Sequence, residues 1–517
     1  MQGHPVKSLS PFVGLDVRWL LETQAAQFAS RTALVWSPFV GAPKTWTYSE
    51  LLRDARAFSA GLTRRGVGVG QRIILHTDNC PEFLIGWLGC ALAGVVPVTT
   101  NAKSSADELA FFADRTDAVA AITQSHFVGL VGAACPRLAW IAAIPGDGER
   151  LARDEDFAGL LAEPNDAPWR AFDPDAPFGI QFTSGTTSRP KAVLWTHANA
   201  LWGARVSAAH EQLTSNDRHL VTMPLFHTNA QVYSVLASLW VGATIVLQPR
   251  FSASRFWDVA VRHACTFASV VPFCVRALMA QPKPERHSFR YWGNAVCEPP
   301  TDQHFGVKTI GWWGMTETIT HGTVGFPDLP NRPMSMGRPS PYYEILVVGG
   351  DGQPIRAGET GDLLIRGVRG LSMFSSYFAD DAATQSAFDE RGYFITGDRV
   401  TLAEDGFMVF ADRSKDMLKV GGENVAASEV ERVIAAVPGV LEVAVVAAPD
   451  AMLDETPFAF VIAAPGIAAD RLKLLIDAAC ARHLATFKHP SGIRIVESLP
   501  RSTLGKVAKA ELRALLR

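Results

Sequence analysis

The chain has 517 residues, of which 48% are hydrophobic and 19% charged, so it can bury a large core and is not expected to be disordered. Its 48 Lys and Arg against 51 Asp and Glu give a formal charge of −3, which argues against nucleic acid as a partner. The seven cysteines are scattered and form no C-x-x-C pair, so neither a disulfide framework nor a zinc site is expected.

The N-terminal segment and the most apolar stretch both indicate a protein without a membrane span. The first 30 residues carry Lys7, Asp16, Arg18 and Glu22 and lack a continuous apolar run, so no secretory signal is expected. Residues 85–98 are the most apolar stretch, but they number fewer than the ~18 needed to cross a bilayer. We therefore predict a cytoplasmic protein.

Short β-branched runs alternate with helical segments through much of the first 400 residues. Residues 72–75 and 95–98 are expected strands, and residues 83–93 and 106–114 are expected helices. This βαβ alternation predicts sheets that are covered by helices. Further strands are expected at residues 118–123, 140–144, 178–182, 192–196, 220–223, 244–247 and 267–271.

Near residue 340 the pattern changes to short strands separated by Gly, Asp and Pro. Such spacing is typical of an antiparallel sheet or a small barrel. The expected strands are residues 344–348, 361–366, 392–396, 399–402 and 407–410.

A second change near residue 411 marks a C-terminal domain. Ser428 and Glu431 have the spacing of a capping box, which predicts the start of a helix that runs to about residue 437. Two strands and a helix follow, at residues 441–448, 458–463 and 470–484.

Together these elements predict an α/β protein. A large N-terminal domain, residues 1–412, is expected to contain helix-covered sheets and a small β-barrel-like subdomain. A mobile α+β C-terminal domain, residues 413–517, is expected to follow.

The strongest functional signal is the segment 182–191, Phe-Thr-Ser-Gly-Thr-Thr-Ser-Arg-Pro-Lys. Its hydroxyls, glycine and lysine lie between two predicted strands and suit a loop that wraps phosphate oxygens. It is not a Walker A loop, because Pro190 stands where that spacing from Gly185 requires glycine and a strand follows instead of a helix. A hydroxyl run alone would favour an ordinary hairpin loop, but the full string is more specific.

Further along the chain, residues 311–317, Gly-Trp-Trp-Gly-Met-Thr-Glu, offer an aromatic face for adenine, a hydroxyl for phosphate and a carboxylate for Mg²⁺. Asp398, which closes the tripeptide Thr-Gly-Asp, can accept both hydroxyls of a ribose. With residues 412–424 and 500–506, these motifs resemble in content and order those of the adenylate-forming superfamily. That superfamily contains acyl-CoA synthetases, firefly luciferase and the adenylation domains of nonribosomal peptide synthetases.

Three positions depart from the motifs of that superfamily. Trp313 stands at the usual place of a tyrosine, and Ser188 and Ala192 stand where glycines are common. Serine keeps a small volume and a hydroxyl, and Ala192 is expected to begin a strand. Nucleotide binding is therefore expected to persist, with altered mobility of the loop.

The resemblance implies that a carboxylate attacks the α-phosphorus of ATP, that pyrophosphate leaves, and that the acyl-adenylate then reacts with CoA. The implied cofactors are ATP, Mg²⁺ and CoA. The implied catalytic residues are Thr316, Glu317, Lys419 and Lys506, with Glu317 on the metal and Lys506 bridging the substrate carboxylate and the α-phosphate. The implied nucleotide and CoA residues are Thr183, Ser184, Gly185, Thr186, Thr187, Lys191, Asn294, Ala295, Trp313, Gly314, Met315, Thr316, Asp398, Arg413, Gly421 and Gly422.

The same resemblance implies that the C-terminal domain rotates between the two half-reactions about a hinge at Lys415. A polar hinge with few contacts permits such rotation. After rotation, residues 419–424 are expected to face the active site. Gly421 and Gly422 would leave room there for the pantetheine arm of CoA.

The substrate side is indicated by residues 224–231, which resemble the superfamily's acyl-site motif. We assign His227 a gating or packing role, because an ionised carboxylate needs no general base. A bulky and partly polar wall favours a short, branched, cyclic or hydroxylated acid. Residues 419–425 also resemble crotonobetaine/carnitine-CoA ligases and medium-chain acyl-CoA synthetases. The expected substrate-binding residues are His227, Asn229, Tyr233, Trp312 and His321.

Other functions are left open by the sequence. A stand-alone adenylation enzyme that loads a carrier-protein thiol would use the same first step, and CoA dependence would distinguish the two. A luciferase-like oxidase has no specific support. A non-catalytic nucleotide sensor would be expected to lack Glu317 or Lys506, and both are present. Self-association into a homodimer is also left open.

Overall fold

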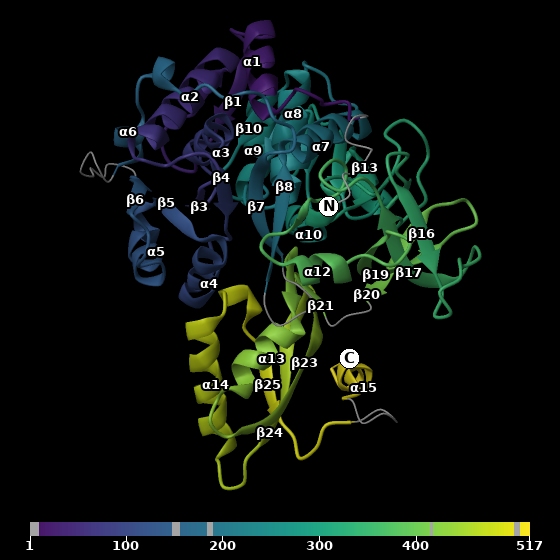
Figure 1. Ribbon diagram of the computed structural model, residues 1–517. Coiled ribbons are helices and arrows are strands. Elements are labelled where there is room, and N and C mark those ends of the chain that lie inside the picture. The colour runs from purple at the N-terminus through teal and green to yellow at the C-terminus, as the bar shows by residue number, and fades with distance from the viewer. Residues whose placement is uncertain (1–9, 147–155, 184–189, 414–416, 501–506, 517) are drawn as a thin grey trace.

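Two helix-covered sheets form most of the N-terminal domain (Figure 1). This computed structural model describes residues 10–146, 156–183, 190–413, 417–500 and 507–516. The first sheet has nine strands, parallel at its centre and antiparallel at both edges. In spatial order they are β15 (Arg338–Pro339), β14 (Thr323–Val324), β13 (Lys308–Trp313), β12 (Tyr291–Asn294), β11 (Phe267–Ser269), β9 (Arg218–Val221), β10 (Thr244–Leu247), β1 (Thr32–Trp36) and β2 (Lys44–Thr47).

The second sheet has seven strands, of which five are parallel to one another. β4 and β10 are buried along their whole length, as expected of parallel strands that are covered on both faces. The βαβ alternation in the sequence is thereby confirmed. In spatial order the strands are β18 (Ser376–Tyr377), β8 (Lys191–Thr196), β7 (Pro177–Thr183), β4 (Val96–Thr99), β3 (Arg72–His76), β5 (Ala118–Gln124) and β6 (Trp140–Ile144).

Helices cover both sheets. Every residue of α3 except Glu82 is buried, since this helix packs inside the body of the domain. In the part of the chain that the structure describes, no helix is long and apolar enough to cross a membrane. The helices are α1 (Val17–Gln27), α2 (Tyr48–Arg64), α3 (Pro81–Ala93), α4 (Ala106–Thr116), α5 (Val128–Ala134), α6 (Phe157–Leu160), α7 (His197–His210), α8 (Ala237–Val241), α9 (Ala253–Arg262), α10 (Pro272–Met279), α11 (Pro299–Phe305) and α12 (Asp381–Ser386), with a π-helix at Asn229–Leu236.

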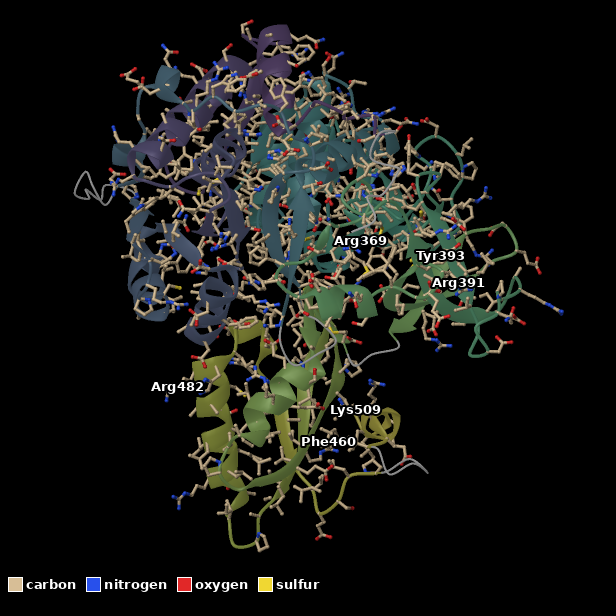
Figure 2. All side chains as sticks on the ribbon, viewed as in Figure 1. Arg369, Arg391, Tyr393, Phe460, Arg482 and Lys509 are labelled. Atoms are coloured by element: carbon tan, nitrogen blue, oxygen red, sulfur yellow. The ribbon has the colours of Figure 1, made fainter. Side chains whose placement is uncertain are left out.

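The predicted antiparallel subdomain is present as a four-stranded sheet beside these layers (Figure 1). The two strands expected at residues 392–402 form a single strand, because a bulge between Arg399 and Val400 absorbs the irregular spacing. The strands are β16 (Glu344–Val348), β17 (Thr360–Arg366), β19 (Phe394–Leu402) and β20 (Met408–Arg413). On this sheet the Arg391 guanidinium lies 5.6 Å from the ring centre of Tyr393 (Figure 2).

The C-terminal domain is a five-stranded sheet with helices on both faces. Its apolar clusters contain only residues from 418 onward, so this domain has a core of its own. Phe460 of the sheet belongs to the same apolar cluster as Leu512 of the last helix, which begins at Lys509 (Figure 2). The elements are β21 (Met417–Val420), β22 (Glu423–Ala426), α13 (Ala427–Ala435), β23 (Val440–Asp450), β24 (Asp454–Ala463), α14 (Ala469–His483), β25 (Gly492–Ile495) and α15 (Lys509–Ala514).

The predicted capping box at Ser428 is wrong. Helix α13 begins at Ala427, so Ser428 lies inside its first turn and cannot be the cap residue. Glu431 has a different role: its Oε1 accepts a hydrogen bond from the Val445 backbone at 2.8 Å and pairs with Lys509 at 2.6 Å. The carboxylate thus joins α13, β23 and α15.

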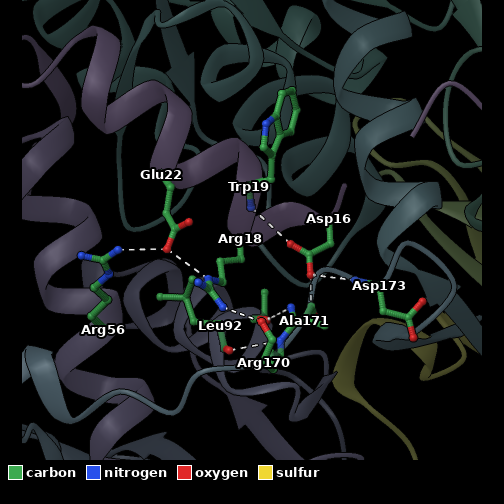
Figure 3. A network of polar contacts seen from close by, with 10 residues as sticks. Asp16, Arg18, Trp19, Glu22, Arg56, Leu92, Arg170, Ala171 and Asp173 are labelled. Atoms are coloured by element: carbon green, nitrogen blue, oxygen red, sulfur yellow. Dashed lines mark hydrogen bonds and ion pairs between the residues drawn. The ribbon is translucent and has the colours of Figure 1, made fainter. Parts of the chain in front are cut away.

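A buried ionic network anchors the first helix to the body of the N-terminal domain (Figure 3). Asp16 is fully buried, and its Oδ2 lies 2.7 Å from Nη1 of Arg170. Its Oδ1 accepts the Trp19 N–H at 3.2 Å and so caps α1. Arg170 also donates to the Leu92 and Ala91 carbonyls at 3.2 and 2.7 Å, which links residues 170–173 to the end of α3.

Replacing Asp16 with alanine is expected to lower the free energy of unfolding by about 3–5 kcal/mol, since it leaves the buried Arg170 charge unpaired. Urea denaturation measures this loss. The control is Asp114→Ala, because the Asp114–Arg137 pair is solvent-exposed on both sides and should contribute less than about 1 kcal/mol. Equal effects of the two substitutions would contradict the prediction.

Candidate active site

A cavity of about 1350 Å³ lies where the carboxyl ends of the two sheets meet the C-terminal domain. Open α/β sheets bind ligands at this edge, and the volume exceeds that of a typical single-ligand pocket. The cavity brings together most of the predicted site residues: Thr183, Lys191, His227, Asn229, Tyr233, Ala295, Trp312, Trp313, Gly314, Met315, Thr316, Glu317, Asp398, Lys419, Gly421 and Gly422.

Asn294 and His321 do not line this cavity. Asn294 is buried at the end of β12, where its Oδ1 accepts the Ala295 N–H at 2.8 Å. Arg413 ends β20 and pairs through its backbone with Asp398. Ser184, Gly185, Thr186, Thr187, Lys415 and Lys506 lie outside the described residues.

Glu317 is held by a buried tyrosine that the sequence did not reveal. The Tyr377 hydroxyl donates to Oε1 of Glu317 at 2.9 Å, and Glu317 is only 4% exposed. Burial and the neighbouring carboxylate raise the pKa of Tyr377, so it remains a donor. Nζ of Lys191 lies 4.6 Å from the centre of the Tyr377 ring. Tyr377 therefore contacts both Lys191, at the end of the motif at residues 182–191, and Glu317, at the end of the motif at residues 311–317.

The Glu317 carboxylate and the Thr316 hydroxyl, both in the motif at residues 311–317, suit the binding of a nucleotide that carries a metal ion. Mg²⁺ commonly uses one or two protein carboxylates together with substrate phosphates. Glu317 provides one such carboxylate, and no cluster of three or more metal-binding side chains occurs among the described residues. A metal carried with ATP therefore fits these residues better than a site built from protein ligands alone. Beside it, Oγ1 of Thr316 accepts from the Thr228 hydroxyl at 3.2 Å.

The tryptophan that replaces the usual tyrosine orients the predicted ribose-binding acid. Nε1 of Trp313 donates to Oδ2 of Asp398 at 2.8 Å, and Asp398 is almost fully buried. A tryptophan N–H is a donor only, so this contact fixes the carboxylate as the acceptor.

The predicted acyl side of the cavity has an aromatic wall. The rings of Trp312 and Tyr233 meet at 65° with centres 5.6 Å apart. Trp312 lies directly over Gly293, where an added Cβ would come within 1.6 Å of the indole, so any larger residue would displace this ring. His321 is buried behind the wall, stacked on Trp312 at 4.3 Å, and does not line the cavity. It supports the wall from the side away from the cavity.

A π-helix places two of the substrate residues. Asn229 and Tyr233 both lie on the π-helix and line the cavity. Such helices are rare and occur frequently at functional sites. Oδ1 of Asn229 is buried and has no hydrogen-bond partner in the described part of the chain, so it is available to a polar group of a ligand.

The C-terminal domain presents the hairpin of β21 and β22 to the cavity. Gly421 and Gly422 have φ of 58° and 92°, which L-residues rarely adopt. Beside them, Oε2 of Glu423 lies 2.9 Å from Nε2 of His227 in the N-terminal domain. Burial opposes the charged imidazole, but the Glu423 carboxylate raises the pKa of His227 above its usual value. The pair therefore holds the hairpin against the acyl site.

Two other described residues of the C-terminal domain, Leu499 and Val507, lie away from the cavity. Leu499 and Val507, near the two ends of the undescribed segment 501–506, belong to the apolar cluster under α15. Neither residue lines the cavity. In this orientation the hairpin of β21 and β22 borders the active site.

Sequence reasoning missed the partners that are distant in the chain. Glu423 belongs to the motif at residues 412–424. Its position directly after Gly421 and Gly422 was the sequence feature that could have indicated a role at the cavity. Tyr377 carried no signal, because its contact with Glu317 spans 60 residues.

Comparisons with known proteins agree with this geometry. The AMP-binding enzyme family matches residues 21–378, and the AMP-binding enzyme C-terminal domain matches residues 429–506. A crotonobetaine/carnitine–CoA ligase of Salmonella heidelberg (strain SL476) is 32% identical over 97% of this chain and 99% of that protein.

Two solved structures are similar in fold. A double mutant of the o-succinylbenzoate CoA synthetase of Bacillus subtilis, bound with its product analogue OSB-NCoA, has a TM-score of 0.81 at 26% identity and covers 96% of this chain and 98% of its own. ATP-bound MatB of Rhodopseudomonas palustris has a TM-score of 0.70 at 25% identity, with 97% and 99% coverage.

Proposed function

The chain belongs to the AMP-binding enzyme family and is an AMP-forming CoA ligase, and from this premise we propose that it joins a short carboxylic acid to CoA by alternating two orientations of its C-terminal domain. ATP and CoA are its co-substrates. The observation that carries the proposal is one cavity lined by both the nucleotide motifs and the Gly421–Gly422 hairpin.

The first step activates the acid. A carboxylate would have to expel oxide, so its oxygen first attacks the α-phosphorus of ATP and pyrophosphate leaves with the electron pair of the broken P–O bond. The protein has no bond to form itself, so its residues position charge and exclude water. Thr316 and Lys191 would hold phosphates, and Asp398 would hold the ribose. Mg²⁺ on Glu317 would neutralise phosphate charge when bound.

The second step needs a path for the pantetheine thiol, which attacks the acyl carbonyl and displaces AMP. The two glycines of the hairpin keep side chains out of that path beside Val271. The Glu423–His227 contact holds the His227 imidazole toward the hairpin at 2.9 Å, in agreement with a gating role for the imidazole.

Two basic residues of the cavity suit the phosphates of CoA. Lys103 and Arg250 both line the cavity. The guanidinium groups of Arg250 and Arg255 lie over the same Phe39 ring at 5.4 and 5.2 Å. No carboxylate within the described residues pairs with either arginine. Two like charges around one ring favour an anionic ligand.

The acid is proposed to be short because Trp312 closes the cavity over Gly293. The buried Oδ1 of Asn229 further favours an acid with a polar substituent. The crotonobetaine/carnitine–CoA ligase in the comparison is named for substrates of this size.

Replacing Trp312 with alanine is expected to shift acid selectivity toward longer chains by at least tenfold in relative kcat/KM. Each methylene that becomes buried contributes about 0.8 kcal/mol, so burying two methylenes is sufficient for a tenfold shift. The ratio of kcat/KM for octanoate to that for butyrate measures the shift. Trp313→Phe is the matched control, because it alters an aromatic ring beside Asp398 and should leave the ratio unchanged. An unchanged ratio in Trp312→Ala would contradict the prediction.

The function is tested by pyrophosphate release and thioester formation over a panel of short, branched, hydroxylated and trimethylammonium acids, with and without CoA. A CoA thioester with stoichiometric AMP is expected for at least one short acid. If the acyl group passed only to a phosphopantetheinylated carrier protein and not to CoA, the enzyme would instead be a stand-alone loading enzyme.

A further inference from the structure

The start of α4 in the N-terminal domain meets the C-terminal domain at residues 483–489 (Figure 1). The Ser105 hydroxyl donates to the His483 carbonyl at 3.1 Å, and the next turn carries Asp107 and Glu108 toward the same segment. Glu108 and Lys488 line the same cavity as the nucleotide motifs, but this contact has no role in the chemistry described above.

A buried lysine lies at the centre of this contact. Nζ of Lys488 donates to Oε1 of Glu108 and, at 2.9 Å, to Oε1 of Glu429. The three side chains are only 8%, 9% and 4% exposed. A charged group with so little water needs its partners, because removing one leaves an uncompensated buried charge.

The two carboxylates come from different domains. Glu429 lies on α13 and moves together with Lys488, whereas Glu108 belongs to α4 of the N-terminal domain. A rotation of the C-terminal domain therefore keeps the Glu429 contact and breaks the Glu108 contact. The triad is complete only in the orientation that places the β21–β22 hairpin at the cavity.

Glu108 is also fixed in place before Lys488 arrives. Its Oε2 accepts the Ser105 N–H at 2.7 Å in a capping box that begins α4. One oxygen thus caps the helix and the other binds the lysine. A preordered acceptor loses little side-chain entropy when the domains meet, which strengthens the contact.

We infer that Glu108 is a positioning residue that stabilises the CoA-transfer orientation of the C-terminal domain through Lys488. This inference rests on the proposed two-step function. It adds that an acid outside the nucleotide motifs sets the rate of the second step and leaves the first step unaffected.

Glu108→Gln tests this inference, because glutamine keeps the capping acceptor and removes the charge. Acid-dependent exchange of pyrophosphate into ATP, measured without CoA, is expected to stay within twofold of wild type and shows that the variant is folded. Single-turnover transfer from acyl-adenylate to CoA is expected to slow at least tenfold. Lys488→Met should slow the same step, and the double variant should lose no more than the worse single variant.

Asp107→Asn is the matched control. Asp107 is the preceding residue and pairs across the same interface with His483, but its side chain is 60% exposed, so both half-reactions should remain within twofold of wild type. The inference is overturned if Glu108→Gln transfers acyl groups at the wild-type rate, or if it loses both half-reactions equally. If wild type exchanges pyrophosphate and makes no acyl-CoA, the proposed function itself fails.

Discussion

Lys506→Ala is expected to reduce acid-dependent pyrophosphate exchange by roughly 10²–10³-fold, the usual loss when one preorganised charge partner of a transition state is removed. Lys506 lies outside the described residues, so the expectation comes from the motif at residues 500–506. The resemblance of that motif to the superfamily implies that the lysine would bridge the attacking carboxylate and the α-phosphate. Transfer from supplied acyl-adenylate to CoA should be retained, because the phosphoryl transfer is then already complete.

Two described residues near this motif, Leu499 and Val507, do not line the cavity. Leu499 and Val507 pack on the α15 face of the C-terminal domain, whereas the hairpin of β21 and β22 borders the cavity.

Two assays test the prediction: pyrophosphate exchange without CoA, and thioester formation from a supplied acyl-adenylate. Lys473→Ala on α14 removes a lysine from the same domain and should change neither rate. Normal exchange in Lys506→Ala, or equal loss of both activities, would contradict it.

Features that depend on neighbouring residues could be predicted from the sequence. The alternation of apolar and helical segments predicted the covered sheets, because both periodicities act over a few residues. The motifs indicated nucleotide-binding residues that are far apart in the chain, and Thr183, Thr316 and Asp398 line one cavity.

Features that depend on contacts between distant residues could not be predicted. The contacts of Glu423 with His227 and of Lys488 with Glu108 span 196 and 380 residues. Local patterns contain no information on such pairs. His321 illustrates the same limit: its sequence neighbourhood indicated the acyl site, but only packing shows that it supports Trp312 from behind.

A substitution in the β21–β22 hairpin should affect the two half-reactions in the opposite way from a substitution of Lys506. Gly422→Leu is expected to slow acyl transfer to CoA by about 10²-fold and to leave pyrophosphate exchange within threefold of wild type. At Gly422 an added Cβ would lie 3.3 Å from Cγ2 of Val271, so a longer side chain must enter the space between the hairpin and the N-terminal domain. That space is the proposed path of the pantetheine arm.

Backbone strain alone would not give this result. Gly422 has φ of 92°, and a leucine there costs about 1–3 kcal/mol wherever it stands. Gly466 has a similar φ of 83° in the same domain, but nothing lies within 4 Å of its added Cβ. Gly466→Leu therefore carries the strain without the obstruction, and its acyl transfer should remain near wild type once the fold is verified by circular dichroism.

Taken with Lys506→Ala, the Gly422 variant distinguishes domain alternation from a single fixed active site. If both steps used one arrangement, an obstruction at the hairpin would crowd the adenylate and slow both half-reactions. If the hairpin enters only after adenylation, Gly422→Leu loses the second step and Lys506→Ala loses the first. A mixture of the two inactive variants should then form no acyl-CoA. Acyl-CoA would form only if acyl-adenylate left one enzyme and bound to the other. A trap for free acyl-adenylate would reveal such a transfer.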